Sequence, residues 1–338
     1  MQKALAIYQI SLNEQDDPKD VVSSTEKQQD GPLSPEEPGQ QIGPYLNCTH
    51  HATGLFSKVY RYQPRKSQAL AIKLTSPGSE QPPHNSAREA RLLRLATHPN
   101  VISLLSTRTL PHSSSLLLVF PFQPLDLATR LVSPSPLPST LLQNIFSALA
   151  HLHEKGILHR DLKPANILLT TPSGPTYLAD FGIAWHGLDP GSEPADEKIT
   201  DVGTTCYRAP ELLFGSRNYS TGVDLWAAGC VAAEVYMHVS PYYNKEWTLF
   251  DAGELGSELA LIKSQFETLG TPEESTWPEA RGLPDWGKMQ FVKYPSKGWE
   301  EILPGVSKER RALVGKLVKF ESGERMSAKA VQTGLGDS

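Results

Sequence analysis

Residues that could hold a metal ion and move a proton gather in one short stretch near the middle of the chain. The segment ILHRDLKPANILL, residues 157–169, carries a carboxylate at Asp161, an ammonium at Lys163 and an amide at Asn166. The loop LADFG follows it, with Asp180 and a glycine that relaxes the backbone. Carboxylate and amide oxygens from two loops suit Mg²⁺ on a nucleotide, and a second aspartate can accept a hydroxyl proton.

A single glycine between two strand-like runs raises the question of how a nucleotide would be held. In ATGLFSKVYRYQPRKSQALAIK, residues 52–73, Gly54 precedes two strands, and the second strand ends on Lys73. A phosphate-binding loop usually shows three glycines, and here Ala52 and Ser57 hold the outer places. One glycine in a strand pattern is also typical of a bulge, so this stretch alone leaves both interpretations open.

Composition and charge narrow the class of protein. The 338 residues are enough for two lobes that share a cleft, and 39% hydrophobic content is ordinary for a globular protein. A net charge of −5 and a pI near 6.1 give no general footprint for nucleic acid or an anionic membrane. The three cysteines lack metal-ligand spacing, and no apolar run reaches the ~20 residues of a membrane helix. We expect an intracellular monomer, in the nucleus or the cytoplasm, that binds neither nucleic acid nor membrane.

The order of strand-like and helix-like segments predicts an α+β fold. Residues 11–44 are rich in Gln, Glu, Asp, Pro and Ser, so we expect residues 1–44 to be a disordered tail, with ordered structure beginning near Tyr45. From there to about residue 122 strands dominate, and helices dominate afterwards. The expected segments are a hairpin within 52–73, a strand at 115–120, and helices at 85–98, 139–155, 221–238 and 257–269.

An ordered set of motifs resembles the eukaryotic protein kinases. The set consists of Lys73, Glu89, His159-Arg160-Asp161, Asn166, Asp180-Phe181-Gly182 and Ala209-Pro210-Glu211. The resemblance covers about residues 45–331 and implies the bilobal kinase fold, with an antiparallel β lobe that contains one helix (about 45–122), a hinge (121–126) and a larger helical lobe (about 127–331). It also implies a serine/threonine kinase that uses ATP and Mg²⁺ and acts on protein substrates.

The resemblance assigns roles to individual residues. Those expected in phosphoryl transfer are the catalytic base Asp161, Lys163 beside the γ-phosphate, Lys73 on the α- and β-phosphates, and Glu89 as the ion-pair partner of Lys73. Those expected to bind Mg²⁺ are Asn166 and Asp180. Those expected around ATP are Gly54 over the phosphates, Val59, Ala71 and Leu168 on adenine, Phe120 behind the pocket, the backbone of Pro121 and Gln123, and Asp126 on the ribose. Those expected to be structural are His159, Arg160 and Phe181, together with a Glu211–Arg325 ion pair.

Several segments are similar to the cyclin-dependent kinase branch of that family. They include CYRAPELLFGSRNYSTGVDLWAAGC, LGTPEESTWPEA and PHNSAREARLLRLATHPNVISLL. Two departures from the branch concern regulation. Leu55 and Phe56 replace the Thr-Tyr pair whose phosphorylation blocks ATP. Ala87 replaces the aliphatic residue that the helix offers to a cyclin, and losing such an anchor weakens an interface by ~2 kcal/mol or more.

A third departure concerns the activation loop, where an activating phosphothreonine usually meets three arginines. Arg88 and Arg160 are present, but Trp185 takes the third place, and Thr200 is the candidate phosphosite. A cyclin partner is therefore disfavoured. The profile looks like the single-subunit fungal kinases that activate cyclin-dependent kinases, with other cyclin-dependent kinases as substrates and a role in cell-cycle or transcription control. Two alternatives stay open: a pseudokinase scaffold, favoured by the incomplete glycine loop, and a kinase that requires a cyclin.

Overall fold

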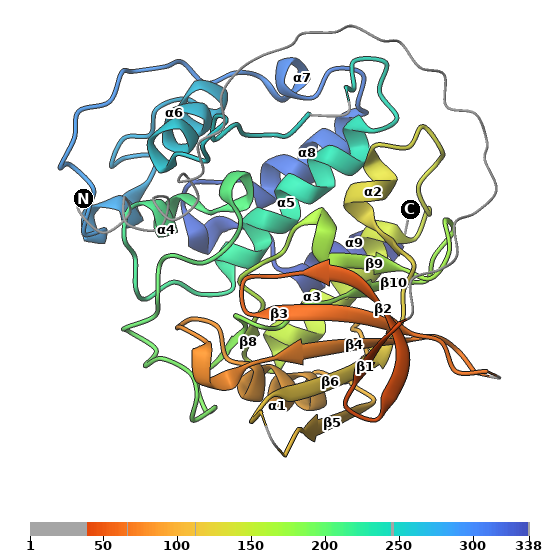
Figure 1. Ribbon diagram of the computed structural model, residues 1–338. Coiled ribbons are helices and arrows are strands. Elements are labelled where there is room, and N and C mark those ends of the chain that lie inside the picture. Colours follow the sequence, from red (N-terminus) through yellow and green to blue (C-terminus); the bar gives the residue numbers. More distant parts are fainter. Residues whose placement is uncertain (1–38, 66, 112, 245–246, 337–338) are drawn as a thin grey trace, which may run out of the picture. The chain divides into compact units, whose positions relative to one another are not determined.

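An antiparallel sheet forms the N-terminal part of the described chain (Figure 1). The computed structural model describes residues 39–336 apart from 66, 112, 245 and 246, and these residues belong to one unit by their contacts. Within this range six strands pair in the order β1-β2-β3-β4-β6-β5. They are β1 (Gln40–Ile42), β2 (Tyr45–Thr53), β3 (Ser57–Tyr62), β4 (Leu70–Thr75), β5 (Ser106–Thr109) and β6 (Leu116–Pro121).

Strand β1 corrects the expected start of ordered structure. We expected a disordered tail through residue 44, but Gln40 lies opposite Cys48 of β2 and Ile42 opposite Tyr45. Ile42 is buried in the apolar cluster on one face of the sheet, and this side chain gives an otherwise polar segment something to bury. The rest of the expected tail, residues 1–38, lies outside the described residues.

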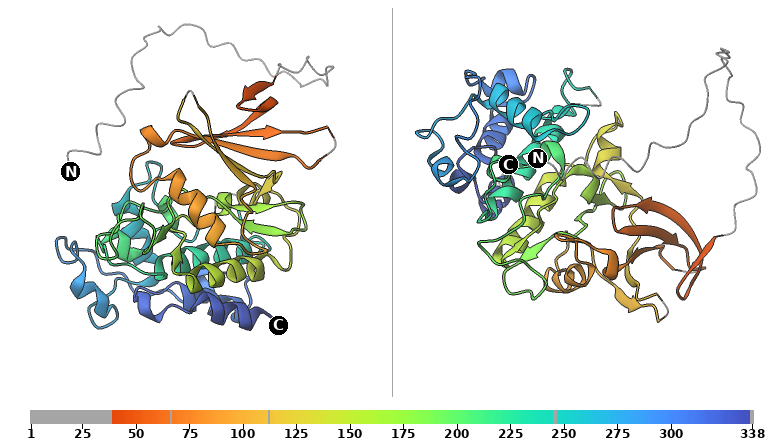
Figure 2. Two further views of the ribbon diagram at one scale, coloured as in Figure 1. Left: turned by 90° about the horizontal axis from the view of Figure 1, so that it is seen from below. Right: turned by 60° about the vertical axis from the view of Figure 1, so that its left-hand side comes forward.

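Helix α1 (Ser86–Leu95) is the predicted helix of the β lobe. It begins after Asn85, whose side-chain oxygen accepts the Arg88 N–H at 2.8 Å as an N-cap. Leu92 and Leu93 are buried, and the helix contacts β6. Figure 2 shows α1 between the sheet and the helical part of the chain. The helix therefore packs against both parts of the chain.

The helical part of the chain surrounds α5 (Gly222–Met237). This helix is buried almost all round, as expected for a core helix, and packs on α8. The predicted helices at 139–155 and 257–269 are α3 (Leu141–Glu154) and α6 (Glu258–Leu269), so the predicted fold class is confirmed. The further helices are α2 (Leu127–Leu131), α4 (Pro210–Leu213), α7 (Trp299–Ile302), α8 (Lys308–Leu317) and α9 (Ala328–Gly336). Among the described residues, every helix is too short or too polar to span a lipid bilayer.

Short strands bring the two motif-bearing loops to the same place. Strand β8 (Ile157–Leu158) pairs with β11 (Trp185–His186), and β9 (Ile167–Leu169) pairs with β10 (Thr176–Leu178). The loop between β8 and β9 and the loop between β10 and β11 must therefore lie side by side. A third short strand, β7 (Leu125–Asp126), pairs with β9 and follows the hinge.

The ion pair that the resemblance implies in the helical part is present. The Arg325 guanidinium donates to both carboxylate oxygens of Glu211, at 2.5 and 2.7 Å, and both side chains are almost completely buried. Arg325 also donates to the carbonyl of Gly222 at the start of α5 and lies over the Trp226 ring. The pair thus fixes α4 against α5 and the segment before α9.

A second buried acid, Glu234 on α5, has no such cationic partner among the residues that the structure describes. Its side chain is almost fully buried, and this burial raises the pKa of Glu234 to about 8, although a hydrogen bond with Tyr207 opposes the shift. The protein therefore folds with Glu234 protonated at neutral pH, whereas the unfolded chain would carry the charge.

We predict that Glu234→Gln raises thermal stability at alkaline pH and matters little at acidic pH. A raised folded-state pKa means that stability present below the ordinary value of 4.5 is lost as the pH rises to about 8, at up to ~1.4 kcal/mol per pH unit. Gln does not titrate, so the difference in melting temperature between variant and wild type should grow across this interval. Glu197→Gln, at an exposed position, is the control. A difference that stays constant with pH would contradict the prediction.

Candidate active site

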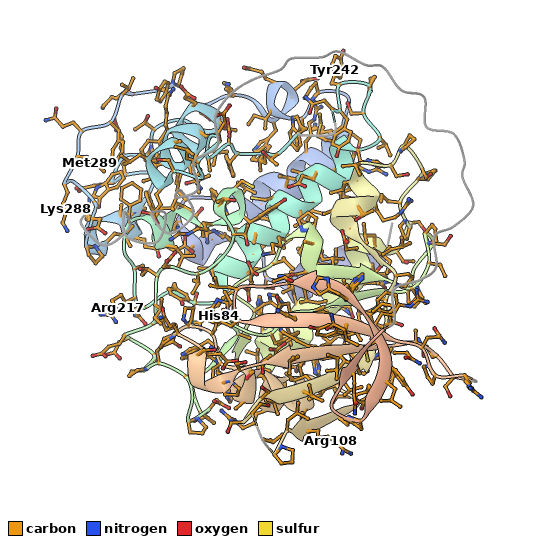
Figure 3. All side chains as sticks on the ribbon, in the orientation of Figure 1. His84, Arg108, Arg217, Tyr242, Lys288 and Met289 are labelled. Carbon is orange, nitrogen blue, oxygen red and sulfur yellow. The ribbon has the colours of Figure 1, made fainter. Side chains whose placement is uncertain are left out.

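The glycine loop is the turn between β2 and β3. It is closed by a hydrogen bond from the Gly54 N–H to the Ser57 carbonyl at 2.8 Å, and a Cβ at residue 54 would come within 3.0 Å of the Ser57 hydroxyl oxygen. Gly54 to Ser57 line a cavity of about 90 Å³ that also contains Lys73, Glu89, Asp161 and Asp180. The side chain of His84 lines the same cavity, and its ring is edge-to-face on Phe56 at 4.9 Å. Figure 3 labels His84 at one edge of the sheet. The turn therefore covers the residues expected at the phosphates.

Three parts of the chain meet at the ammonium group of Lys73. Strand β4 carries Lys73, whose Nζ donates to the two carboxylate oxygens of Glu89 on α1 at 2.7 and 2.9 Å. The same Nζ donates to Asp180 Oδ1 at 2.9 Å. Burial alone would lower the pKa of Lys73, but the two carboxylates outweigh it and raise that pKa above its ordinary value. The charge of Lys73 in turn lowers the pKa of Asp180, so that carboxylate is ionised at neutral pH.

The loop before β9, which carries Asp161, is fixed to α5 by hydrogen bonds to Asp224. Its carboxylate accepts the backbone N–H groups of His159 and Arg160, each at 2.9 Å, and the His153 side chain at 2.9 Å. Burial alone would raise the pKa of Asp224, but these donors lower it. Arg160 has φ of 67°, a left-handed conformation that is unfavourable for a residue with a side chain. The two hydrogen bonds to Asp224 stabilise that conformation, which sets the direction of the next residue, Asp161.

Asp161 is oriented by three neighbours. Its Oδ2 lies 2.9 Å from Lys163 Nζ and accepts a hydrogen bond from the Asn166 amide at 2.9 Å. Its Oδ1 accepts the Thr204 hydroxyl at 2.7 Å, and Lys163 also donates to that hydroxyl at 2.7 Å. Sequence reasoning missed this role of Thr204, which lies 43 residues from Asp161 along the chain. A carboxylate with both oxygens directed in this way can accept a proton from a hydroxyl group in the cavity.

Asn166 and Asp180 offer oxygens suited to Mg²⁺. Asn166 uses its NH₂ group on Asp161, which leaves its amide oxygen for a cation. Asp180 lines the cavity and is half exposed, with 48% of its side chain accessible. Lys73 donates to its Oδ1, so Oδ2 can face a cation. A Cβ at Gly182 would lie 3.3 Å from Asp180 Oδ1, so glycine allows this close approach. One carboxylate and one amide oxygen match the preference of Mg²⁺ for hard oxygen ligands.

The residues expected at adenine lie on neighbouring strands and do not line the cavity. Ala71 on β4 is directly opposite Phe120 on β6, and Leu70 is opposite Pro121. Val59 is opposite Lys73. Ala71, Phe120 and Val59 therefore share the face of the sheet that carries Lys73. Their contact with adenine stays a prediction.

The hinge residues make contacts of their own. Gln123 accepts a hydrogen bond from the Thr170 hydroxyl at 2.7 Å, so its side chain is occupied and its backbone is available. Asp126 caps α2, accepting the Thr129 N–H at 2.7 Å and the Thr129 hydroxyl at 3.0 Å. Leu168 lies opposite Asp126 in the β7–β9 pair. Contact of Asp126 with a ribose would compete with this cap.

His159 and Phe181 are buried side chains between the two loops of the site. His159 is completely buried and its Nε2 donates to the Ala179 carbonyl at 2.9 Å. The Phe181 ring packs edge-to-face on His159 at 5.0 Å and is also fully buried. The two rings connect the loop of Asp161 to the loop of Asp180.

Comparisons with known proteins agree with this geometry. Residues 52–334 match the protein kinase domain family. The chain is 37% identical over 286 residues to "Serine/threonine-protein kinase csk1" of Schizosaccharomyces pombe, an alignment that covers 82% of this chain and 90% of that protein. It is 34% identical over 302 residues to "Cyclin-dependent kinase D-1" of Arabidopsis thaliana, covering 86% of this chain and 70% of that one.

The chain therefore belongs to the protein kinase family. Within the family it is a serine/threonine protein kinase of the cyclin-dependent kinase type, and the predicted recognition and enzyme class are confirmed. Protein kinases in general use ATP and Mg²⁺ and phosphorylate proteins.

We predict that Asp180→Ala abolishes Mg²⁺-dependent phosphate transfer while the melting temperature changes little. The variant removes the most exposed oxygen ligand of the cavity, and charge neutralisation by the metal is central to phosphoryl transfer. A loss in kcat of at least about a hundredfold, or ~3 kcal/mol of barrier, is expected in a radiolabelled phosphate assay. Asp196→Ala, at an exposed position, is the matched control. Retention of roughly a tenth of the wild-type kcat would contradict the assigned role.

Proposed function

We propose that this kinase phosphorylates other cyclin-dependent kinases on an activation-loop threonine or serine, as a single subunit that needs neither a cyclin nor a phosphate on its own loop. The observation that carries the proposal is the docking of α1, which bears Glu89, against residues of the same chain. The activation segment, defined as residues 180–211, makes these contacts. We place the activity in the nucleus or the cytoplasm, in cell-cycle or transcription control.

The contacts that dock α1 run along its length. At the start of the helix the Asn85 N–H donates to the Gly182 carbonyl at 3.1 Å. Further along, Arg91 donates to both oxygens of Asp189, at 2.7 and 2.8 Å. The Asp189 side chain is 5% exposed, and its hydrogen bond to Arg91 lowers the pKa of that carboxyl. A two-point pair of this kind is geometrically specific, so it supports Glu89 in the position where it meets Lys73.

The surface that relatives offer to a cyclin is weak in this chain. Ala87 is exposed on α1, and a methyl group contributes little to the core of an interface. The place of the inhibitory phosphosites is also altered, because Leu55 and Phe56 carry no hydroxyl. These features support a kinase without the two switches that the branch uses at these positions.

In the proposed reaction the chain positions the reactants and neutralises charge. Bound Mg-ATP supplies the transferable phosphoryl group. Asp161 accepts the proton of the substrate hydroxyl, and Lys163 lies next to that carboxylate at 2.9 Å. Lys73 would hold phosphate oxygens, and Asn166 and Asp180 would hold Mg²⁺.

We predict that the purified chain alone, with Mg-ATP, phosphorylates a catalytically inactive cyclin-dependent kinase and not the same protein with alanine at its activation-loop threonine. Ala87→Ile should change this rate less than about threefold, since the helix is already docked. Phosphorylation of a general basic protein is measured in parallel, so that an inactive preparation is recognised. Activity on the basic protein without activity on the kinase would refute the substrate. A gain of about a hundredfold on adding a cyclin would refute independence.

We also predict that phosphorylation of Thr200 is dispensable. Its carbonyl accepts a hydrogen bond from Arg208 at 3.0 Å, a contact that does not involve the hydroxyl group. Trp185 has a structural role: its indole N–H donates to the carbonyl of Glu193 at 2.9 Å, and Lys198 lies over its ring at 4.7 Å. Thr200→Ala or phosphatase treatment should change kcat less than about threefold, and Trp185→Ala should reduce it more. The reverse order of effects would place the protein among phosphorylation-dependent kinases.

A further inference from the structure

Two buried guanidinium groups lie where α1, the loop before β9 and the activation segment meet. Only 2% of the Arg88 side chain and 0% of the Arg160 side chain is exposed. Burial, followed by the charge of Arg160, lowers the pKa of Arg88 to about 10. Two cations removed from water at one place are destabilising unless an anion accompanies them.

The carboxylate of Glu193 is that anion. Its Oε1 lies 3.2 Å from Arg160 Nη1, and its Oε2 lies 3.5 Å from Arg160 Nη2 and 3.7 Å from Arg88 Nη1. The other partners of the two guanidinium groups are neutral oxygens: the carbonyls of Ile183, Gly191 and Pro83 and the hydroxyl of Tyr219. The nearby Asp189 is engaged by Arg91. Glu193 thus supplies the negative charge that both arginines share.

The position of Glu193 is fixed independently of its charge. The Trp185 indole holds the Glu193 carbonyl, and Lys198 lies over the rings of both Trp185 and Tyr219, at 4.7 and 5.2 Å. Lys198 also donates to the Ala195 carbonyl. Hydrogen bonds at residues 193 and 195 therefore hold the backbone in place without any contribution from the Glu193 carboxylate.

We propose that Glu193 is a positioning residue for phosphoryl transfer, a permanent carboxylate at the place where relatives put an activating phosphate. Arg88 directly precedes Glu89, and Arg160 directly precedes Asp161. By joining the two arginines, the carboxylate fixes the Lys73 partner relative to the catalytic base. This role does not depend on which protein the kinase phosphorylates.

The test uses the full chain, phosphatase-treated, in the variants Glu193→Ala, Glu193→Gln and the control Glu197→Ala, whose exposed side chain lies in the same segment. Glu193→Ala should lower kcat at least about tenfold, with the ATP dissociation constant changed less than about threefold. Because 14% of the Glu193 side chain is exposed, small anions can reach the space left by alanine. Roughly 0.1 M formate should restore Glu193→Ala at least about threefold more than chloride at equal ionic strength, and should not restore Glu193→Gln, in which the space is filled.

Each outcome decides the proposal. Recovery with formate in Glu193→Ala alone supports a charge at this point, because a purely structural defect would not distinguish formate from chloride. Equal recovery with both salts, or none, overturns it. If Glu193→Ala does not fold, Glu193→Gln decides: a kcat within about threefold of the wild type overturns the proposal, and a loss of about tenfold or more with an unchanged melting temperature supports it.

Discussion

The ammonium group of Lys73 is the point on which the arrangement of the site depends. It lies within 2.9 Å of carboxylates from α1 and from the loop after β10, so a strand, a helix and a loop are fixed by one charge. Lys73 and Glu89 are both buried and balance each other's charge, so removing either would leave an unpaired buried charge, whereas the half-exposed Asp180 is the second anion and is partly solvated by water. The Lys73–Glu89 pair thus ties α1 to strand β4 of the sheet.

Much of this fold and site can be predicted from sequence, for physical reasons that differ between residues. Helices α3, α5 and α6 follow from apolar spacing, and the Lys73–Glu89 and Glu211–Arg325 pairs follow from motifs in which each partner has a fixed place. Strand β1 was not predicted, because its polar segment carries a single buried apolar residue, Ile42. Sequence reasoning also missed the roles of Asp224, Thr204 and Glu193, because their hydrogen-bond partners lie between 33 and 71 residues away along the chain. A carboxylate in a polar loop gives no local sign that it will neutralise an arginine.

The contacts that fix the loop of Asp161 differ in kind from the contacts that dock α1. Asp224 stabilises a left-handed backbone at Arg160, which directs a single side chain. The pairs of α1 with the activation segment fix a whole helix, through longer side chains and more exposed contacts such as Arg91, 42% of whose side chain is accessible. The first arrangement is rigid because it is buried and uses backbone N–H groups. The second combines side-chain pairs such as Arg91–Asp189 with one backbone hydrogen bond, from the Asn85 N–H to the Gly182 carbonyl.

The attachment of α1 through Arg91 and Asp189 has a consequence for the cell in which the chain is made. A helix held by residues of its own chain is in place as soon as folding is complete, so under the proposed function a new molecule would have no waiting period for a subunit. If the enzyme needs no separate activating event, as proposed, the amount of activity would follow the number of molecules. Synthesis and degradation of the chain then become the natural points at which its output is set.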